Sequence, residues 1–204
     1  MWILPSRQRP ESLKRFFDHY AKTKADTPGL VVLDRDDPEL DGYASVTLPE
    51  GWSLIVEPRH KSLGALQNSI YERFSHLPWF GMVADDVTPL TDGWDRALVE
   101  AAGSDGVAYG YDSINKGKSF THGVLGGDFV RALGWLILPG LDRLYGDNVI
   151  MEVATRKGVL RYLPDVFMEH LHFSNGTAPI DDTYRKLNAA QDRAIYEAWI
   201  TTLK

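Results

Sequence analysis

The chain contains no cysteine, which excludes disulfide frameworks, thiolate metal sites and a cysteine nucleophile. It also lacks an apolar run close to the about 20 residues that span a bilayer. Its longest apolar stretch, 132–141, is interrupted by Gly134 and Pro139, and residues 1–8 do not have the pattern of a signal peptide. These absences predict a cytoplasmic protein with no membrane span.

Positive charge is scarce, with a formal net charge of −6. A surface built for nonspecific nucleic-acid binding is therefore disfavoured, because counterion release requires clustered Lys and Arg. The first 25 residues are nevertheless basic, whereas 34–41 is acidic. This asymmetry fits either an anionic ligand near the N-terminus or a solvated helix face.

Glycine-rich phosphate loops are missing as well. The first predicted strand-to-helix turn, 5–10, contains neither G-x-G-x-x-G nor G-x-x-x-x-G-K-[ST], so dinucleotide binding and P-loop chemistry lose their main support. No G-x-S-x-G elbow supports an activated serine either. Instead the turn offers Ser6, Arg7 and Arg9, whose donors suit phosphate oxygens, unless the arginines are simply exposed.

Strand and helix patterns alternate along the first half of the chain. With 204 residues and 44% hydrophobic content, they predict one α/β domain, 1–204, whose mostly parallel central sheet is flanked by helices. The predicted strands are 2–4, 30–33, 44–48, 53–56, 79–84, 106–111, 123–130, 159–162 and 166–172. The predicted helices are 11–24, 61–74, 92–101 (capped by Asp92), 129–136, 147–157 and 182–203.

Acidic residues follow two of the predicted strands. Asp34 ends the run LVVL, and the pair Asp85 and Asp86 ends the strand 79–84. Open α/β sheets bind ligands at the carboxyl ends of their strands. Adjacent carboxylates there suit Mg²⁺ or Mn²⁺, although a polar turn or helix cap is the alternative.

Two further features concern the second half. His170 and His172 lie on one face of the last predicted strand, where they extend the ligand set that the acids offer, or serve as structural histidines. Asp147 opens a predicted helix, either as its N-cap or as a carboxylate base.

In this order the motifs resemble family 2-like GT-A glycosyltransferases, of the nucleotide-diphospho-sugar transferase superfamily. The resemblance implies a single-domain, Rossmann-like GT-A fold with a nucleotide-binding half (about 1–90) and an acceptor half (about 91–180). The C-terminal helix (about 182–203) lies outside the part of the chain that shows the resemblance. It implies that these residues bind the donor: Pro5, Ser6, Arg7, Arg9, Asp34, Gly64, Asn68 and Asp85.

The same resemblance implies a bound Mn²⁺ or Mg²⁺, held by Asp86 together with His170 or His172. The first acid of a strict D-x-D motif is replaced by Ala84. Asp147 is implied to be the catalytic base, in a reduced form of an E-D motif. A base there predicts inversion, whereas a retaining enzyme needs none.

We therefore expect a metal-dependent enzyme that transfers a sugar from a nucleoside diphosphate sugar, with uridine diphosphate the carrier by resemblance, to an acceptor hydroxyl. The acceptor stays open among a glycan, a protein, a small molecule and a hydroxymethylated DNA base. Two alternatives are a nucleotidyltransferase and a nucleotide- or carbohydrate-binding module with a degenerate site.

Overall fold

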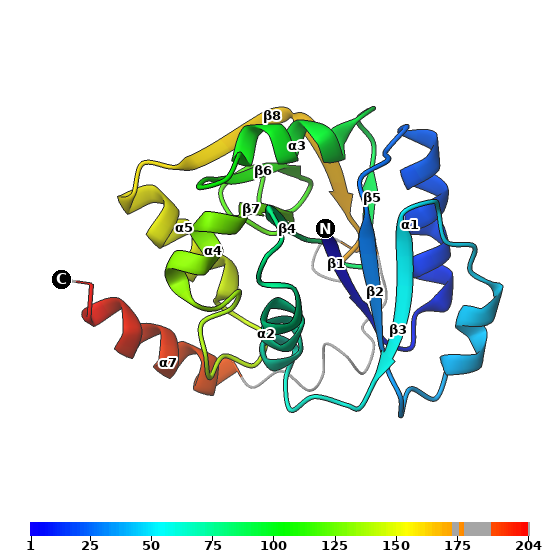
Figure 1. The fold of residues 1–204 in the computed structure, drawn as a ribbon, viewed down its shortest axis with the longest axis horizontal. Coiled ribbons are helices and arrows are strands. Elements are labelled where there is room, and N and C mark those ends of the chain that lie inside the picture. Colours follow the sequence, from blue (N-terminus) through cyan, green and yellow to red (C-terminus); the bar gives the residue numbers. More distant parts are fainter. Residues whose placement is uncertain (173–175, 178–188, 204) are drawn as a thin grey trace.

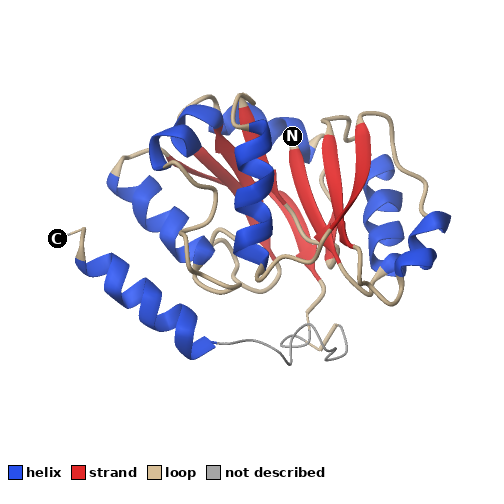
Figure 2. Ribbon diagram, turned by 60° about the horizontal axis from the view of Figure 1, so that its bottom comes forward, coloured by secondary structure: helices blue, strands red, loops and turns tan. Residues whose placement is uncertain are grey.

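An eight-stranded sheet runs through the computed structural model, which describes residues 1–172, 176–177 and 189–203. Its strand order is β3-β2-β1-β4-β7-β6-β8-β5. Helices cover both faces of the sheet, so the molecule has three layers (Figures 1 and 2). Within the described residues, no helix combines the length and the apolar character needed to cross a membrane.

The strands are β1 (Trp2–Ser6), β2 (Gly29–Asp34), β3 (Trp52–Glu57), β4 (Trp79–Met82), β5 (Val87–Pro89), β6 (Val107–Asp112), β7 (Gly123–Gly126) and β8 (Leu160–His170). The α-helices are α1 (Pro10–Lys22), α2 (Leu63–Phe74), α3 (Trp94–Ala102), α4 (Gly127–Leu133), α5 (Gly146–Arg156) and α7 (Ala189–Thr201). A 3-10 helix, η1, covers Leu40–Ser45.

The sheet is mixed, so the prediction of a mostly parallel sheet is wrong. Strands β1 to β4 pair in parallel and so do β6 and β8, but β7 is antiparallel to both of its neighbours and β5 is antiparallel to β8. A parallel pair needs a crossover of a dozen or more residues. The ten residues 113–122 between β6 and β7 are too few for one, and β5 begins only five residues after β4 ends.

Several predicted elements differ from the structure. The expected strand 44–48 does not form, because η1 occupies its start and buries Tyr43 against the first strand-to-helix turn. The strands predicted at 159–162 and 166–172 are one strand, β8, whose extra residues cause a shift in register opposite β6. Gly93 rather than Asp92 is the N-cap of α3. The predicted helix 182–203 is described only as α7, because 182–188 lie outside the described residues.

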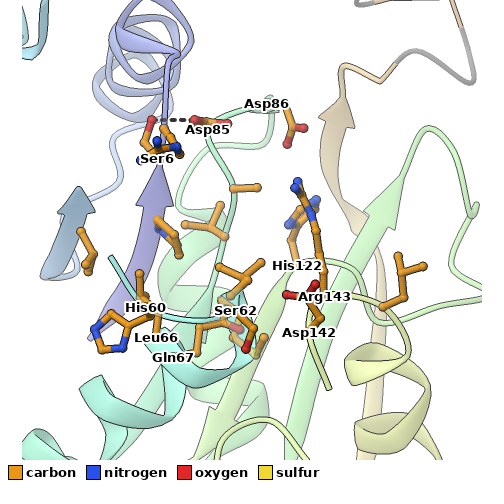
Figure 3. A pocket seen from close by; sticks show the side chains of 18 of the residues that line it. Ser6, His60, Ser62, Leu66, Gln67, Asp85, Asp86, His122, Asp142 and Arg143 are labelled. Carbon is orange, nitrogen blue, oxygen red and sulfur yellow. Dashed lines mark hydrogen bonds between the residues drawn. The ribbon is translucent and has the colours of Figure 1, made fainter. Parts of the chain in front are cut away.

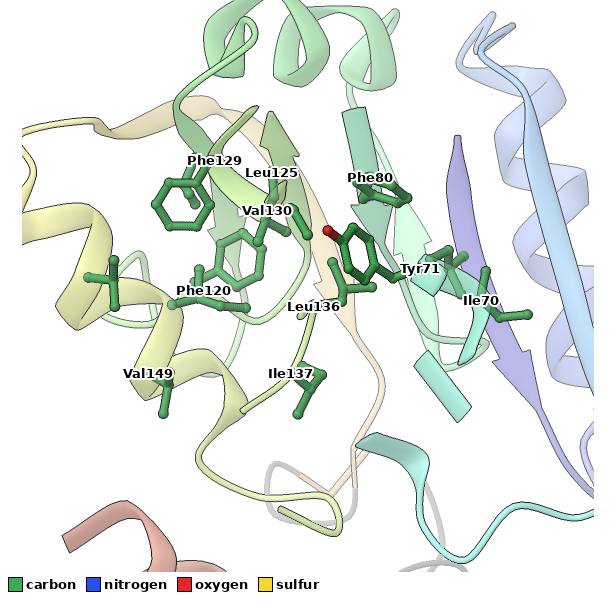
Figure 4. Packing of buried hydrophobic residues seen from close by; sticks show 14 of the residues in the cluster. Ile70, Tyr71, Phe80, Phe120, Leu125, Phe129, Val130, Leu136, Ile137 and Val149 are labelled. Carbon is green, nitrogen blue, oxygen red and sulfur yellow. The ribbon is translucent and has the colours of Figure 1, made fainter. Parts of the chain in front are cut away.

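Alternating side chains of the central strands divide the core between the two faces of the sheet. Trp2 and Leu4 of β1 pack on the side of α1 and α3, whereas Ile3 packs on the side of α2, α4 and α5. Figure 4 shows the second of these cores, in which Phe80, Phe120 and other apolar side chains interdigitate. Each fully buried side chain of this kind contributes roughly 1.5–3 kcal/mol.

Strands β1, β2, β4, β6 and β8 run in the same direction, so their carboxyl ends lie along one edge of the sheet. Residues at or just after the ends of β1, β2, β4 and β8 carry many of the polar side chains that line a cavity at this edge.

Candidate functional site

A cavity of about 540 Å³ lies at this edge of the sheet. Its lining comes from separate parts of the chain: residues 5–9, Val32 and Asp34 of β2, the segments 59–63, 82–86, 120–122 and 142–145, Leu66 and Gln67 of α2, and Asp147, His170 and His172. Ten of the twelve site residues predicted from the sequence line it: Pro5, Ser6, Arg7, Arg9, Asp34, Asp85, Asp86, Asp147, His170 and His172.

We call residues 5–9, 34 and 84–86 the first wall of the pocket. Its centre is a chain of hydrogen bonds around the buried Asp85 carboxylate. Ser6 Oγ donates to Asp85 Oδ2 at 2.6 Å (Figure 3). The Tyr43 hydroxyl lies 2.9 Å from Ser6 Oγ. The backbone N–H of Arg9 donates to the same Tyr43 oxygen at 3.1 Å. These hydrogen bonds hold the turn 5–9 against Asp85 and Tyr43.

Arg9 lies across the acid pair. One guanidinium nitrogen, Nη1, is 3.1 Å from Asp85 Oδ1 and 3.2 Å from Asp86 Oδ2, and all three side chains are largely buried. Burial and the neighbouring charge of Asp86 raise the pKa of Asp85 to about 6, against the opposing effects of Arg9 and Ser6. The guanidinium is thus the counter-ion of two carboxylates that repel each other.

Arg7 faces the other way. Its Nη1 contacts Asp34 at 3.0 Å and Asp36 at 2.7 Å, so it binds the acidic end of β2. Between the two arginines, Gln8 has a φ of 58°, a left-handed conformation that costs about 1 kcal/mol in a non-glycine residue. Its N–H donates to Asp37 at 2.8 Å, which holds the strained turn in place.

Three histidines gather beside Asp86. Asp86 Oδ1 lies 3.6 Å from His170 Nε2, and the ring of His170 is 4.8 Å from that of His122 and 5.4 Å from that of His172. Burial, with the neighbouring His170, lowers the pKa of His122 to about 3, so this ring stays neutral. Sequence patterns gave no signal for His122, which lies alone in the segment between β6 and β7.

This donor set combines a carboxylate with imidazoles, a chemistry that suits Mn²⁺ and related cations. In the arrangement observed, however, the described residues contain no group of three His, Asp or Glu side chains that would hold a metal ion. Arg9 already forms ion pairs with both acids and balances one of their two negative charges. Asp86, His170 and His172 therefore fit a cation only if Arg9 withdraws from Asp86.

We call residues 142–147 the second wall. Asp147 lies in the first turn of α5 and accepts a hydrogen bond from Ser119 Oγ at 2.8 Å. The N-cap of α5 is Tyr145, so the interpretation of Asp147 as the cap is wrong. Its carboxylate lines the pocket instead. Arg143 enters the cavity from the same wall (Figure 3), a residue that no sequence motif indicated.

Gly64 and Asn68, the other two predicted donor residues, are placed outside the cavity lining. Asn68 Oδ1 accepts from the N–H groups of Leu136 and Ile137, both at 2.9 Å, and its Nδ2 donates to the Ile137 carbonyl at 2.8 Å. A Cβ on Gly64 would lie 2.6 Å from the carbonyl oxygen of Leu141. In this structure both residues hold α2 against the segment that leads to the second wall.

Comparisons with known proteins find likeness in structure alone. No family model matches the chain, and no curated protein matches it. Among solved structures, the fold resembles Rv0371c of Mycobacterium tuberculosis H37Rv in complex with manganese, with a TM-score of 0.54 and 13% sequence identity over 91% of this chain and 95% of that chain.

It also resembles TarS of S. aureus, with a TM-score of 0.58 and 12% identity over 83% of this chain. The likeness covers 59% of the TarS chain. At these identities the likeness concerns the fold, and it is consistent with the glycosyltransferase-like architecture expected from the sequence, with a mixed sheet.

Proposed function

We propose that the protein is a glycosyltransferase that moves a sugar from a nucleoside diphosphate sugar, with uridine diphosphate the first carrier to test, to an acceptor hydroxyl. The observation that carries the proposal is the convergence of four separate polar segments on one cavity: the turn 5–9, the acid pair 85–86, the α5 start with Asp147, and the histidines at the end of β8.

In this proposal the first wall binds the donor. Asp34 at the end of β2 would contact the base, and the Ser6 and Arg9 region would approach the phosphates, because hydroxyl and guanidinium donors match phosphate oxygens. Asp85 would accept a hydrogen bond from a hydroxyl of the ribose or sugar. Its two oxygens are already bonded to Arg9 and Ser6, so donor binding would exchange at least one of these contacts.

Asp147 is proposed as the general base. It lies on the wall opposite the acid pair, and its hydrogen bond from Ser119 fixes one carboxylate oxygen while the side chain faces the cavity. A carboxylate in this position would take the proton of an acceptor hydroxyl as the sugar bond forms. The acceptor classes named above all present such a hydroxyl.

A divalent cation is proposed at Asp86, His170 and His172, once Arg9 has moved. Bound there, Mn²⁺ or Mg²⁺ would neutralise the charge of the departing diphosphate. The similar Rv0371c structure is a complex with manganese, which supports testing this ion first. The proposed roles of Asp34, Asp85 and Asp147 are the same whether Arg9 or a metal ion supplies the positive charge near the diphosphate.

The test is calorimetric titration of the protein with a panel of nucleoside diphosphate sugars, each with and without Mn²⁺, followed by product analysis. Saturable binding of one donor and release of its nucleoside diphosphate are expected. Release of pyrophosphate would indicate nucleotidyl transfer instead. No binding of any donor would contradict the proposal.

A second candidate is a nucleotide-binding module without turnover. The contact of Arg9 with both carboxylates favours it, because a guanidinium that stays between the two acids occupies the position where a metal would bind them. This candidate predicts donor binding that is unaffected by Mn²⁺ and no product with any acceptor.

A further inference from the structure

The buried Asp192 of α7 binds the backbone of the second wall. Its carboxylate accepts three hydrogen bonds, from the N–H groups of Asp142 at 2.7 Å, Arg143 at 3.0 Å and Leu144 at 2.7 Å. Asp192 is only 1% exposed, and it does not line the cavity. Three consecutive amides thus point at one carboxylate, which fixes the conformation of these residues.

The rest of α7 packs on the same part of the molecule. Tyr196 stacks on Tyr145 with ring centroids 5.1 Å apart and an interplanar angle of 19°. Ile195, Tyr196 and Trp199 pack against the core that contains α5. Tyr145 itself has a φ of 66°, so the stacking braces a left-handed residue just before Asp147. Figure 1 shows α7 beside these segments.

The side chain that this arrangement aims is Arg143. From the second wall it reaches into the pocket, on the side where Asp86 and His122 lie (Figure 3). A cation there faces any anion that enters the cavity.

We infer that Asp192 is a positioning residue that aims Arg143 as a binding residue for the phosphate groups of an anionic ligand. This rests on the proposed function insofar as the ligand is a nucleoside diphosphate, but the phosphate contact is testable alone. The fixed backbone of 142–144 limits the directions that the Arg143 side chain takes, so less conformational entropy is lost when phosphate binds. In this way α7, which does not line the pocket, would strengthen the binding of phosphate groups in it.

The chain offers a matched control in Asp95 of α3. Asp95 is also fully buried and also accepts three hydrogen bonds, from the N–H groups of Asp26 and Thr27 and from the Thr27 hydroxyl. None of these residues lines the cavity. Asp95→Ala should therefore destabilise the fold much as Asp192→Ala does, without changing the pocket.

The experiment measures the dissociation constants of inorganic pyrophosphate, uridine diphosphate and uridine by calorimetry, at a temperature where every variant is folded. Arg143→Gln and Asp192→Ala should each weaken pyrophosphate and uridine diphosphate binding about tenfold, with uridine binding unchanged. Asp192→Asn keeps one oxygen to accept two of the three N–H groups and should lose about threefold. Asp95→Ala should leave all affinities unchanged.

Adding Asp192→Ala to Arg143→Gln should cost no further affinity, because both changes remove the same contact. Full pyrophosphate affinity in Arg143→Gln, an equal loss from Asp192→Ala in both backgrounds, or no pyrophosphate binding by the wild type would each overturn the inference. Turnover of donor sugars is scored separately. Phosphate binding that depends on Arg143 without any sugar transfer would refute the proposed function and leave this inference standing.

Discussion

The first wall of the pocket is held by contacts among its own side chains, whereas the second wall is held from elsewhere in the chain. Ser6 and Arg9 both hydrogen-bond to Asp85, and although 79 and 76 positions of sequence separate these pairs, all three residues lie at or close to the ends of strands. Residues 142–144 instead depend on Asp192, some 50 positions away in sequence. Strand ends place the first wall directly, while the second wall is a loop that needs external support.

The difference suggests a division of tasks. A wall locked by short-range ion pairs is preorganised for one ligand, the donor in our proposal. The conformation of the second wall depends on the positions of α2 and α7, which support it. This wall carries Asp147, the proposed base. The four predictions below break one wall at a time, in order of decreasing effect.

The largest effect is expected at the second wall from Asp147→Asn. Loss of the general base should lower the rate of sugar transfer, or of donor hydrolysis with water as acceptor, about 10³-fold, which corresponds to roughly 4 kcal/mol in the barrier. Donor affinity should change less than twofold. The control is Asp142→Asn, an acid of the same wall with no proposed proton transfer. Equal rate losses in the two variants would show that the transfer rate depends on the negative charge of this wall and not on a general base at Asp147.

At the first wall, Arg9→Gln leaves the buried Asp85 and Asp86 without their counter-ion. The free energy of unfolding should fall by about 3 kcal/mol in urea titrations without metal. Affinity for Mn²⁺ should rise about tenfold, because the ion no longer competes with a guanidinium, and Mn²⁺ should restore part of the lost stability. Arg7→Gln, which disturbs only the pairs with Asp34 and Asp36, is the control. Unchanged Mn²⁺ affinity in Arg9→Gln would argue against a cation site at Asp86.

A change in α2 tests the support of the second wall. Asn68→Ala removes three hydrogen bonds to residues 136–137 and should lower the free energy of unfolding by about 2 kcal/mol. Donor affinity should be unchanged if Asn68 acts only through α2. Ser69→Ala, whose hydroxyl bonds only within the helix, should cost a few tenths of a kcal/mol. A selective loss of donor binding in Asn68→Ala would restore the donor role that the sequence predicted.

The smallest effect is expected from Tyr43→Phe, which changes a residue of η1 that supports the first wall. Loss of the hydroxyl that contacts Ser6 and the Arg9 N–H should cost about 1 kcal/mol of stability and weaken donor binding two- to threefold. Tyr20 is a matched control, because its buried hydroxyl donates to the Thr27 carbonyl and burial raises the pKa of both phenols to about 12. Tyr20→Phe should lose similar stability with full donor affinity. Equal donor affinities in the two variants would remove Tyr43 from the pocket's function.

The N-terminal half of the fold followed closely from the sequence. Helix α1 and strands β1, β2 and β4 are confirmed to within a few residues, because their apolar patterns are strong and polar residues follow them. Strand β1 nevertheless runs through Pro5 to Ser6, and β4 ends at Met82. The sheet's mixed direction did not follow. Periodicity identifies a strand but carries no information on the direction of its neighbour, so β7 was assigned to the wrong kind of sheet.

By itself, the sequence determined which residues end strands and therefore which polar side chains share an edge: Ser6, Asp34, Asp85, Asp86 and His170. This is local information, since the carboxyl ends of parallel strands meet at one edge whatever else the chain does. Only the tertiary structure decided that Arg9 lies on the acid pair, that Asn68 supports a loop, and that Asp192 binds the amides of 142–144. Those contacts join residues up to 77 positions apart, and no local pattern encodes which distant donor a buried carboxylate will meet.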